Sequence, residues 1–238
     1  MGALLWSAAR LAARARPPRL RALLLGTPRI GAAPSRTRFA GLELDGGPGV
    51  FVPRRMSEPL VGLAIERLAA GDVMVEAGTG CGAVALAVAR SRPDAEIHAV
   101  DTSAEAVRWA RRNAARLGLD RVRFHRGSLL EPLPPGVAGR VGVIVSSVPY
   151  VAPGRWGDRD RYGAVEGAGA DGLDLQRALA AQAIPALRPG GFLLQQLGAG
   201  QWSGLAEELG RMGFATGEIL GGSAGDVLTW ARRNAVDP

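Results

Sequence analysis

Apolar and polar residues follow one another along the chain in a pattern that predicts helices and buried strands in alternation. Apolar residues at helical spacing mark the segments 58–70, 83–90, 103–117, 173–187 and 205–212. Short apolar runs of strand length occupy 73–75, 97–100, 122–125, 141–145 and 192–196. Two further runs, 214–220 and 227–231, are placed to form an antiparallel pair that closes the sheet. This alternation predicts an α/β fold with a mostly parallel, doubly wound sheet.

Several of these segments carry signals at their ends. Ser57 is expected to cap the helix over 58–70, and Ser103 to cap the later helix that Gly118 ends. The glycine- and aspartate-rich segment 154–172 is interpreted as a loop. The predicted elements leave no room for a second domain after residue 45.

The positive charge of the chain is concentrated at its front. The formal net charge is +7, and the chain contains arginine but no lysine. Residues 1–40 hold eight arginines and no acidic residue, whereas residues 41–238 hold 21 arginines against 22 acidic residues, a net charge of −1. We therefore expect a basic N-terminal arm over 1–40 and one domain over 41–238. Net charge gives no support for direct binding of nucleic acid by that domain.

The composition of the arm fits two interpretations. An arginine-rich, alanine-rich and acid-free front is typical of an amphipathic transit peptide. It also fits a partly helical or disordered arm encoded by a GC-rich bacterial genome, which is the interpretation we favour because arginine replaces lysine throughout. The apolar stretches are too short to span a bilayer, and no secretory signal is evident, so we expect a cytoplasmic protein.

Cysteine and histidine are too scarce for several kinds of site. Cys81, the one cysteine, excludes an internal disulfide and a multi-cysteine zinc site. Since His98 and His125 are the only histidines, no metal centre is expected. Cys81 lies among glycines and has no basic neighbour in the sequence, so we interpret it as a small side chain in a crowded turn rather than a nucleophile.

The loop after the first strand is the clearest candidate binding site. It reads Glu76-Ala77-Gly78-Thr79-Gly80-Cys81-Gly82 and opens a helix. Glycines let the backbone approach a ligand closely, and a helix N-terminus offers N–H groups and positive potential that suit a carboxylate. Asp101, at the end of the second strand, can accept hydrogen bonds from both ribose hydroxyls of a nucleoside cofactor. The pair therefore suits S-adenosylmethionine.

The same loop permits two other interpretations. Gly78-x-Gly80-x-x-Ala83 satisfies the relaxed fingerprint of dinucleotide-binding proteins, which would make the ligand NAD and the protein a dehydrogenase. A tight turn without a ligand is the third interpretation. Glycines at alternate positions, with an acidic residue two positions before the first, favour S-adenosylmethionine.

A second motif follows the fourth strand, at the edge where doubly wound sheets bind ligands. It reads Ser147-Val148-Pro149-Tyr150 and resembles the Asn/Asp-Pro-Pro-Tyr motif of methyltransferases that act on planar, amide-type nitrogens. The other matching segments are Phe51-Val52-Pro53-Arg54, Glu76–Gly82, Ala170-Asp171-Gly172-Leu173 and Gln196-Leu197-Gly198-x-x-Gln201. Their order makes residues 42–232 similar to the HemK-type family, which methylates a glutamine side-chain amide in peptide-chain release factors. The likeness is closest to a short, actinobacterial-type branch of protein-glutamine methyltransferases.

This resemblance implies a Rossmann-like, S-adenosylmethionine-dependent methyltransferase and assigns roles to matching positions. The residues implied to bind the cofactor are Glu76, Gly78, Thr79, Gly80, Cys81, Gly82, Asp101, Leu129 and Ser147. Among them, Gly78 to Gly82 would hold the methionine portion, Asp101 the ribose, and Leu129 would pack near the adenine. The catalytic segment would be Ser147, Val148, Pro149 and Tyr150, which grips the target amide. Phe51 and Arg54 would line the substrate entrance, a release factor would be the partner, and no metal is implied.

The chain departs from the family pattern in several places. Ser147 replaces Asn, and its hydroxyl reaches about 1 Å less far than an amide arm. Val148 replaces the first proline, Asp160-Arg161 stands where a Glu-Pro pair is usual, and Gln196 replaces a glutamate. The front lacks the helical N-terminal substrate domain. Loss of one fixed hydrogen-bonding group in comparable sites costs roughly 10²–10³ in rate.

Four hypotheses therefore stay open. The leading one is a methyltransferase acting on a glutamine amide. The others are a methyltransferase with another acceptor, such as a small molecule or a nucleobase; a protein that binds the cofactor with weak or lost catalysis; and an NAD-dependent enzyme. The sequence does not indicate the oligomeric state.

Overall fold

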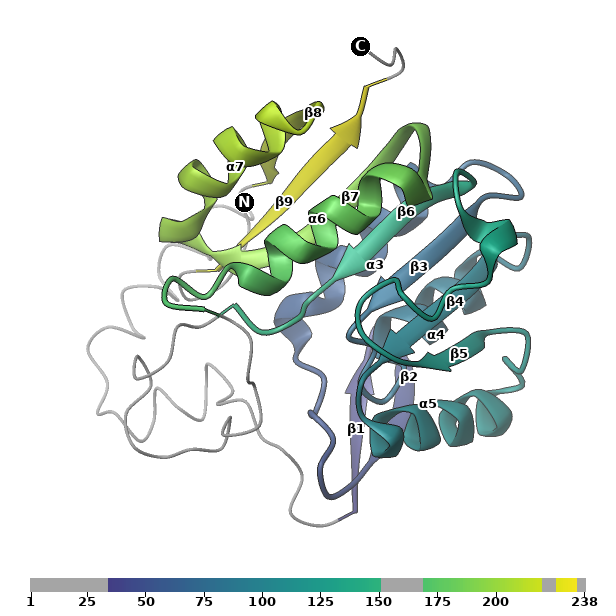
Figure 1. Cartoon of the computed structure of the whole chain (residues 1–238). Coiled ribbons are helices and arrows are strands. Elements are labelled where there is room, and N and C mark those ends of the chain that lie inside the picture. Colours follow the sequence, from purple (N-terminus) through teal and green to yellow (C-terminus); the bar gives the residue numbers. More distant parts are fainter. Residues whose placement is uncertain (1–33, 151–168, 220–225, 235–238) are drawn as a thin grey trace, which may run out of the picture.

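The computed structural model describes residues 34–150, 169–219 and 226–234, which form one α/β unit (Figure 1). Its strands are β1 (Ser35–Phe39), β2 (Leu42–Gly46), β3 (Val73–Ala77), β4 (Glu96–Asp101), β5 (Arg123–Arg126), β6 (Val141–Ser146), β7 (Leu187–Gly198), β8 (Phe214–Ile219) and β9 (Asp226–Arg233). Its α-helices are α3 (Glu58–Arg67), α4 (Ala83–Ser91), α5 (Ala104–Leu117), α6 (Asp174–Ala186) and α7 (Trp202–Arg211). Three short 3-10 helices complete these elements: η1 (Arg55–Ser57), η2 (Pro135–Val137) and η3 (Ala199–Gln201).

Seven strands form the central sheet in the order β5-β4-β3-β6-β7-β9-β8. The strands from β5 to β7 run parallel, and β9 pairs antiparallel with both β7 and β8. The expected doubly wound sheet with a closing antiparallel pair is confirmed. Chain order reverses between β3 and β6, because β4 and β5 lie on one side of β3 and the later strands on the other. Ligands of such sheets bind at this switch point, beyond the carboxyl ends of the strands.

Helices cover both faces of the sheet, as Figure 1 shows. The apolar residues of α3, α4 and α5 form one core with one face of the sheet, and those of α6 and α7 form a second core on the opposite face. The central strands β3 and β6 are buried throughout, which explains their unbroken apolar runs. Two separate cores hold the sheet rigid from both sides, and this fixes the loops at its carboxyl edge.

The two ends of helix α5 lie where the capping residues in the sequence predict them. Its first turn is capped by the Ser103 hydroxyl, which accepts from the Ala106 N–H at 3.2 Å, and Gly118 ends it in the left-handed conformation at φ 66°. Both expectations are confirmed. The expectation for Ser57 is wrong, since its side chain caps no helix. Its hydroxyl donates instead to Gln196 Oε1 at 2.8 Å, because the short helix η1 already leads the chain into α3.

The antiparallel hairpin of β1 and β2 was not expected from the sequence. Phe39, Leu42 and Leu44 are fully or almost fully buried and belong to the same core as α3, α4 and α5. The strand β1 thus lies within the range 1–40 assigned to the arm but packs with the domain; residues 1–33 lie outside the described residues. The buried side chain of Asn113 joins the hairpin to α5 and to the loop after β3. Asn113 of α5 accepts from Asp45 N and donates to Asp45 O and Cys81 O, at 2.8, 2.8 and 3.0 Å.

The element boundaries that differ most from the predicted ones lie in α3, α7 and β7. The helix α3 ends at Arg67 rather than at 70, because Leu68 is already extended, and α7 starts at Trp202 rather than at 205. The strand β7 begins at Leu187, ahead of the predicted 192–196, and its pairing with β6 shifts register between Val141 and Val143 to absorb the Pro189-Gly190-Gly191 turn. Within the described ranges, no helix is long and apolar enough to cross a membrane.

The role of Asn113 leads to a prediction. Replacing Asn113 by Ala should lower the free energy of unfolding by about 3 kcal/mol, because it leaves the hairpin's Asp45 backbone groups buried without partners. Urea denaturation measures this loss. The change Ala115→Gln, at an exposed position of the same helix, serves as the control and should stay within about 0.5 kcal/mol of the parent. An equal loss of unfolding free energy for Asn113→Ala and Ala115→Gln would contradict the role assigned to Asn113.

Candidate active site

The predicted site residues lie on loops that leave one edge of the sheet. The glycine loop follows β3, Asp101 ends β4, Leu129 follows β5, and Ser147 follows β6. Because β5, β4, β3 and β6 are consecutive parallel strands, their carboxyl ends lie side by side. The structure therefore brings together residues that are separated by up to 71 positions in the chain.

The glycine loop touches the segment after β6. Gly78 and Thr79 donate their N–H groups to Val100 O at 2.9 and 3.0 Å, which ties the loop to the end of β4. Gly78 has a φ of 79°, and a Cβ atom at this position would lie 2.8 Å from Val148 Cγ1. Glycine is required here by both the backbone conformation and the space.

Glu76 lies beneath this loop and is buried, with 3% of its surface exposed. Its Oε2 accepts two hydrogen bonds, from Thr79 Oγ1 at 2.7 Å and from Ala85 N at 2.9 Å. Burial raises the pKa of Glu76 to about 8, against the opposing effect of these two donors. No described residue donates to its Oε1, so this atom can face a cationic ligand.

Asp101 is held by two backbone groups. Gly80 N donates to its Oδ2 at 2.8 Å and Ser103 N donates to its Oδ1 at 2.9 Å. Burial raises the pKa of Asp101, while these two N–H donors oppose the rise. Each carboxylate oxygen can still accept one more hydrogen bond. The carboxylate is thus fixed in orientation and can accept hydrogen bonds from a pair of neighbouring hydroxyls.

Two further predicted cofactor residues, Cys81 and Leu129, occupy confined positions. Cys81 is buried, and burial raises the pKa of its thiol to about 12, so its thiolate is scarcely populated at neutral pH. Leu129 is buried and has a φ of 49°, in the left-handed region. Its loop is fixed to neighbouring elements, because Gly127 N donates to Asp101 O at 3.0 Å and Leu130 N donates to Gln182 Oε1 at 2.8 Å.

The segment Ser147-Val148-Pro149-Tyr150 is fixed by glutamine side chains. Gln176 of α6 donates to Pro149 O at 3.2 Å, and Gln201 donates to Tyr150 O at 2.6 Å. The Tyr150 hydroxyl accepts from Gln196 Nε2 at 3.3 Å, while Gln196 Oε1 accepts from Ser57. We call Gln176, Gln196 and Gln201 the glutamine brace. Sequence comparison with the family pattern had drawn attention to Gln196 and Gln201, whereas no sequence signal had pointed to Gln176 or Ser57.

Two acceptors of this segment are not used within the described structure. The Ser147 hydroxyl, on a half-buried side chain, makes no hydrogen bond to a described residue. No described donor reaches Val148 O either, although Val148 N donates to Ser146 Oγ at 3.3 Å. Pro149 O and Tyr150 O, by contrast, are occupied by the brace. The segment therefore holds two adjacent acceptors that the described residues leave unused.

Phe51 and Arg54 precede α3 at the same end of the sheet. Phe51 is 39% exposed, more than any other large apolar side chain among the described residues. A Cβ atom at Gly80 would lie 3.9 Å from Phe51 O, so this segment lies next to the glycine loop. Asp160 and Arg161, where the family pattern has a Glu-Pro pair, lie outside the described residues. No group of three His, Cys, Asp or Glu suited to a metal occurs in the described part of the chain.

Comparison with known proteins identifies the class of enzyme. The family model described as "Methyltransferase domain" matches residues 68–194. A methyltransferase from Pyrococcus furiosus superposes with a TM-score of 0.63 at 22% identity, covering 82% of this chain and 90% of that one. A Thermus thermophilus 16S rRNA N2 G1207 methyltransferase, in complex with AdoMet and guanosine, gives 0.64 at 23% identity, covering 84% and 50%. These structures share the fold. The chain has the Rossmann-like fold of S-adenosylmethionine-dependent methyltransferases.

Curated relatives identify the family within this class of methyltransferases. The release factor glutamine methyltransferase of Streptomyces coelicolor is 40% identical over 173 residues, covering 67% of this chain and 59% of that one. That of Neisseria gonorrhoeae is 38% identical over 192 residues, covering 79% and 70%. The chain belongs to the release factor glutamine methyltransferase family, and its cofactor is S-adenosylmethionine. It spans about 60% of the length of the first relatives it matches, at 59%, 64%, 63% and 62%. The short actinobacterial-type branch stays a prediction.

The burial of Glu76 leads to a prediction about pH. The folded protein binds a proton at Glu76 up to a pH of about 8, whereas the unfolded chain loses it near 4.5. The contribution of Glu76 to stability is therefore complete below pH 4.5 and is lost as the pH rises toward 8. Relative to Glu76→Gln, the parent should lose up to about 1.4 kcal/mol per pH unit across this window.

Chemical denaturation of both proteins without cofactor, at each half pH unit from 5 to 9, measures this difference. The change Glu207→Gln removes an exposed carboxylate of α7 and serves as the control, since it should preserve the pH profile of the parent. Parallel pH profiles for the parent and Glu76→Gln would refute the assignment of a protonated, buried carboxyl group.

Proposed function

We propose that the chain transfers a methyl group from S-adenosylmethionine to the side-chain amide nitrogen of a glutamine in a peptide-chain release factor. The contact between Gly78 and Val148 carries this proposal, because it joins the candidate cofactor loop to the candidate acceptor segment. Family membership supports the reaction. The chain covers less than two thirds of several relatives, so the substrate and partner are inferred from the site and the resemblance together.

The site residues fit the cofactor in three respects. The Cα surface of Gly80 is open, since an added Cβ atom would meet only Phe51 O at 3.9 Å. Glu76 Oε1 would accept from the cofactor's ammonium group. Asp101 has one free acceptor site on each oxygen, which matches two ribose hydroxyls. Leu129 supplies an apolar side chain for the adenine. Thr79, Cys81 and Gly82 would shape the turn rather than contact the reacting atoms. When bound, S-adenosylmethionine supplies an electrophilic methyl group on a sulfonium.

The acceptor segment addresses the chemical difficulty of the reaction. An amide nitrogen is a weak nucleophile because its lone pair is delocalised into the carbonyl. The Ser147 hydroxyl and Val148 O would accept the two N–H groups of the target amide and so turn its nitrogen toward the methyl group. Fixed dipoles of this kind need no reorganisation during the reaction. The nitrogen forms the new N–C bond as the S–C bond breaks, and one N–H proton passes to water.

The remaining residues of the proposed site position the substrate. Pro149 and Tyr150 are held by the glutamine brace, so the two acceptors keep their orientation when the substrate binds. Phe51 and Arg54 would line the entrance, where an exposed aromatic ring offers apolar contact to a peptide. The cytoplasmic location expected from the sequence also stays a prediction.

The cofactor site is tested at Gly78. Replacing Gly78 by Ala should abolish binding of S-adenosylmethionine, measured by calorimetry. The added Cβ atom would lie 2.8 Å from Val148 Cγ1, so Val148 would have to move and the loop would be distorted. Gly71 provides a matched control, since its φ is 71° and nothing lies within 4 Å of an added Cβ atom. Gly71→Ala should bear the same backbone strain and keep the affinity of the parent. Equal losses for both variants would refute the proposed site.

The acceptor is tested with labelled S-adenosylmethionine and purified release factor. We expect label on one glutamine, located by mass spectrometry. Ser147→Ala should lower kcat at saturating cofactor about 10-fold, the value of one neutral hydrogen bond. Ser147→Asn should raise kcat, because its amide oxygen reaches further. Label on another molecule in a lysate would favour a different acceptor. Cofactor binding without any transfer, rescued by Ser147→Asn, would indicate lost catalysis.

A further inference from the structure

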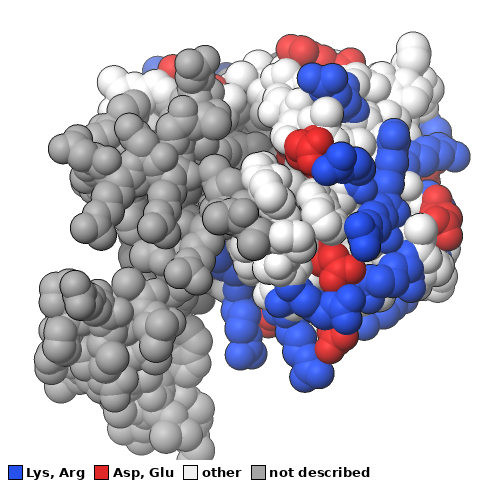
Figure 2. All heavy atoms as spheres, turned by 90° about the horizontal axis from the view of Figure 1, so that it is seen from below, with Lys and Arg blue, Asp and Glu red and all other residues white. Residues whose placement is uncertain are grey.

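The net charge of the domain conceals an uneven distribution. Residues 104–126, which contain α5 and β5, hold seven arginines against two acidic residues, a net charge of +5. The other residues from 41 onward hold 14 arginines against 20 acidic residues. Figure 2 views the molecule from the side on which α5 lies in Figure 1, and arginine side chains gather on the described part of this face. A face of this kind attracts anions although the domain as a whole is almost neutral.

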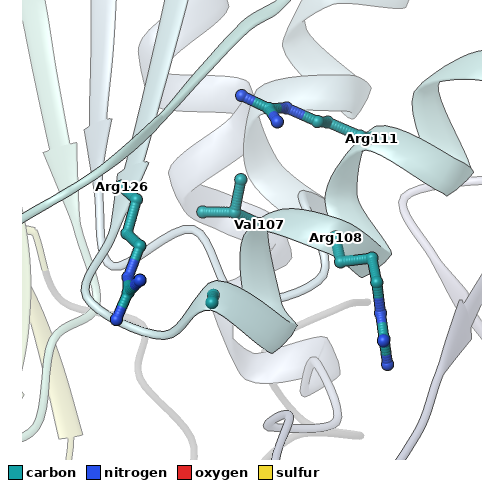
Figure 3. Close-up of a pocket in the computed structure, with 5 residues that line it drawn as sticks. Val107, Arg108, Arg111 and Arg126 are labelled. Carbon is teal, nitrogen blue, oxygen red and sulfur yellow. The ribbon is translucent and has the colours of Figure 1, made fainter.

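A hollow on this face is lined in part by arginine side chains. It has a volume of about 250 Å³ and is lined by Ala104, Val107, Arg108 and Arg111 of α5 and by Arg126 at the end of β5. We call it the arginine hollow. Figure 3 shows Arg111 and Arg126 on opposite sides of Val107, while Arg108 points away along the helix. The buried Val107 thus forms an apolar floor between two guanidinium groups.

Backbone carbonyls hold these two guanidinium groups in place and leave their positive charge uncompensated. Arg111 donates to Phe124 O at 2.9 Å, and Arg126 donates to Thr102 O at 3.4 Å. Neither forms an ion pair with a described carboxylate. Other arginines on this face differ, since Arg116 pairs with Asp45 and Arg123 with Glu96. Each guanidinium has five N–H donors, so most donors of Arg111 and Arg126 are available to a ligand.

A second hollow lies between α5 and the β1–β2 hairpin. It has a volume of about 280 Å³, and its lining residues include Arg112, Trp109 and Arg36, which is ion-paired with Asp45 of the same hollow at 2.8 Å. Arg112 lies over the Trp109 ring at 5.2 Å, and no described carboxylate pairs with it. Arg111 and Arg112 are consecutive on α5 and therefore point to different sides of the helix, one toward each hollow. Unpaired arginines thus occur on both sides of α5.

We propose that this face binds the phosphodiester backbone of a single nucleic-acid strand, with one phosphate in the arginine hollow. Arginine forks bind phosphate oxygens in pairs, and a strand presents several phosphates, which suits the excess of arginine spread over α5 and β5. An isolated carboxylate on a protein surface would engage only one of these arginines. The face uses no residue of the proposed methyl-transfer site, so binding is measured independently of that proposed function.

The test measures binding of a fluorescent 12-nucleotide RNA to the full chain by anisotropy, at several salt concentrations. The variant carries Arg111→Gln and Arg126→Gln. Removing two phosphate contacts should weaken binding about 10- to 100-fold at low salt and reduce the slope of log K against log [salt] by about 1.4. DNA of the same sequence should bind equally, because phosphate contacts do not distinguish the two sugars.

The matched control carries Arg211→Gln and Arg232→Gln, which remove the same charge from exposed positions on α7 and β9, away from this face. It should bind RNA within twofold of the parent. The single change Arg126→Glu provides a second variant if the double change lowers the unfolding midpoint. Unchanged RNA binding by both hollow variants would overturn the proposal and assign any binding to other residues, such as 1–40. If polyglutamate displaced the labelled RNA as strongly as polyuridylate does, the proposal would be overturned in favour of an acidic protein partner.

Discussion

The approach of Gly78 to Val148 is the constraint on which the site depends. Ala77 and Ser146 are paired neighbours at the ends of two parallel strands, so the residues that follow them must share one small space. A side chain at 78 would occupy the position of Val148. The glycine is thus explained by packing between two loops. As a result, the loop after β3 and the segment after β6 are in direct contact in the folded domain.

The departures from the family motif become understandable through hydrogen bonds. A proline at 148 would fix φ but could not donate, whereas Val148 N donates to Ser146 Oγ and regains part of the lost rigidity. Gln196 accepts from Ser57 and donates to Tyr150 while only 3% exposed. An ionised glutamate could accept from both hydroxyls but would bury a charge. The neutral amide therefore suits a site that already contains the buried carboxyl group of Glu76.

The sequence predicted the parallel core and the site loops well, because buried strands have unbroken apolar runs and their carboxyl ends must lie together. It did not reveal the β1–β2 hairpin, whose apolar residues Phe39, Leu42 and Leu44 are interrupted by charged ones over only a few positions. Asn113 was missed since a polar residue on a buried helix face has no periodic signal. Gln176 was missed for the same reason. Such residues have a function only through backbone groups that lie far away in the chain, and no local pattern records those partners.

Arginine in this chain has two separable functions, and net charge does not distinguish them. Arg177 binds Asp171 and Glu208, and Arg188 binds Asp72, so these charges are neutralised locally while they join distant segments. Arg111 and Arg126 are instead held by backbone carbonyls, which orient a guanidinium but leave its charge uncompensated. What a surface can bind is thus decided by the partners of each charged group rather than by the net charge of the surface. Because the neutralised arginines contribute little field, Arg111, Arg112 and Arg126 provide most of the charge that this face offers to a ligand.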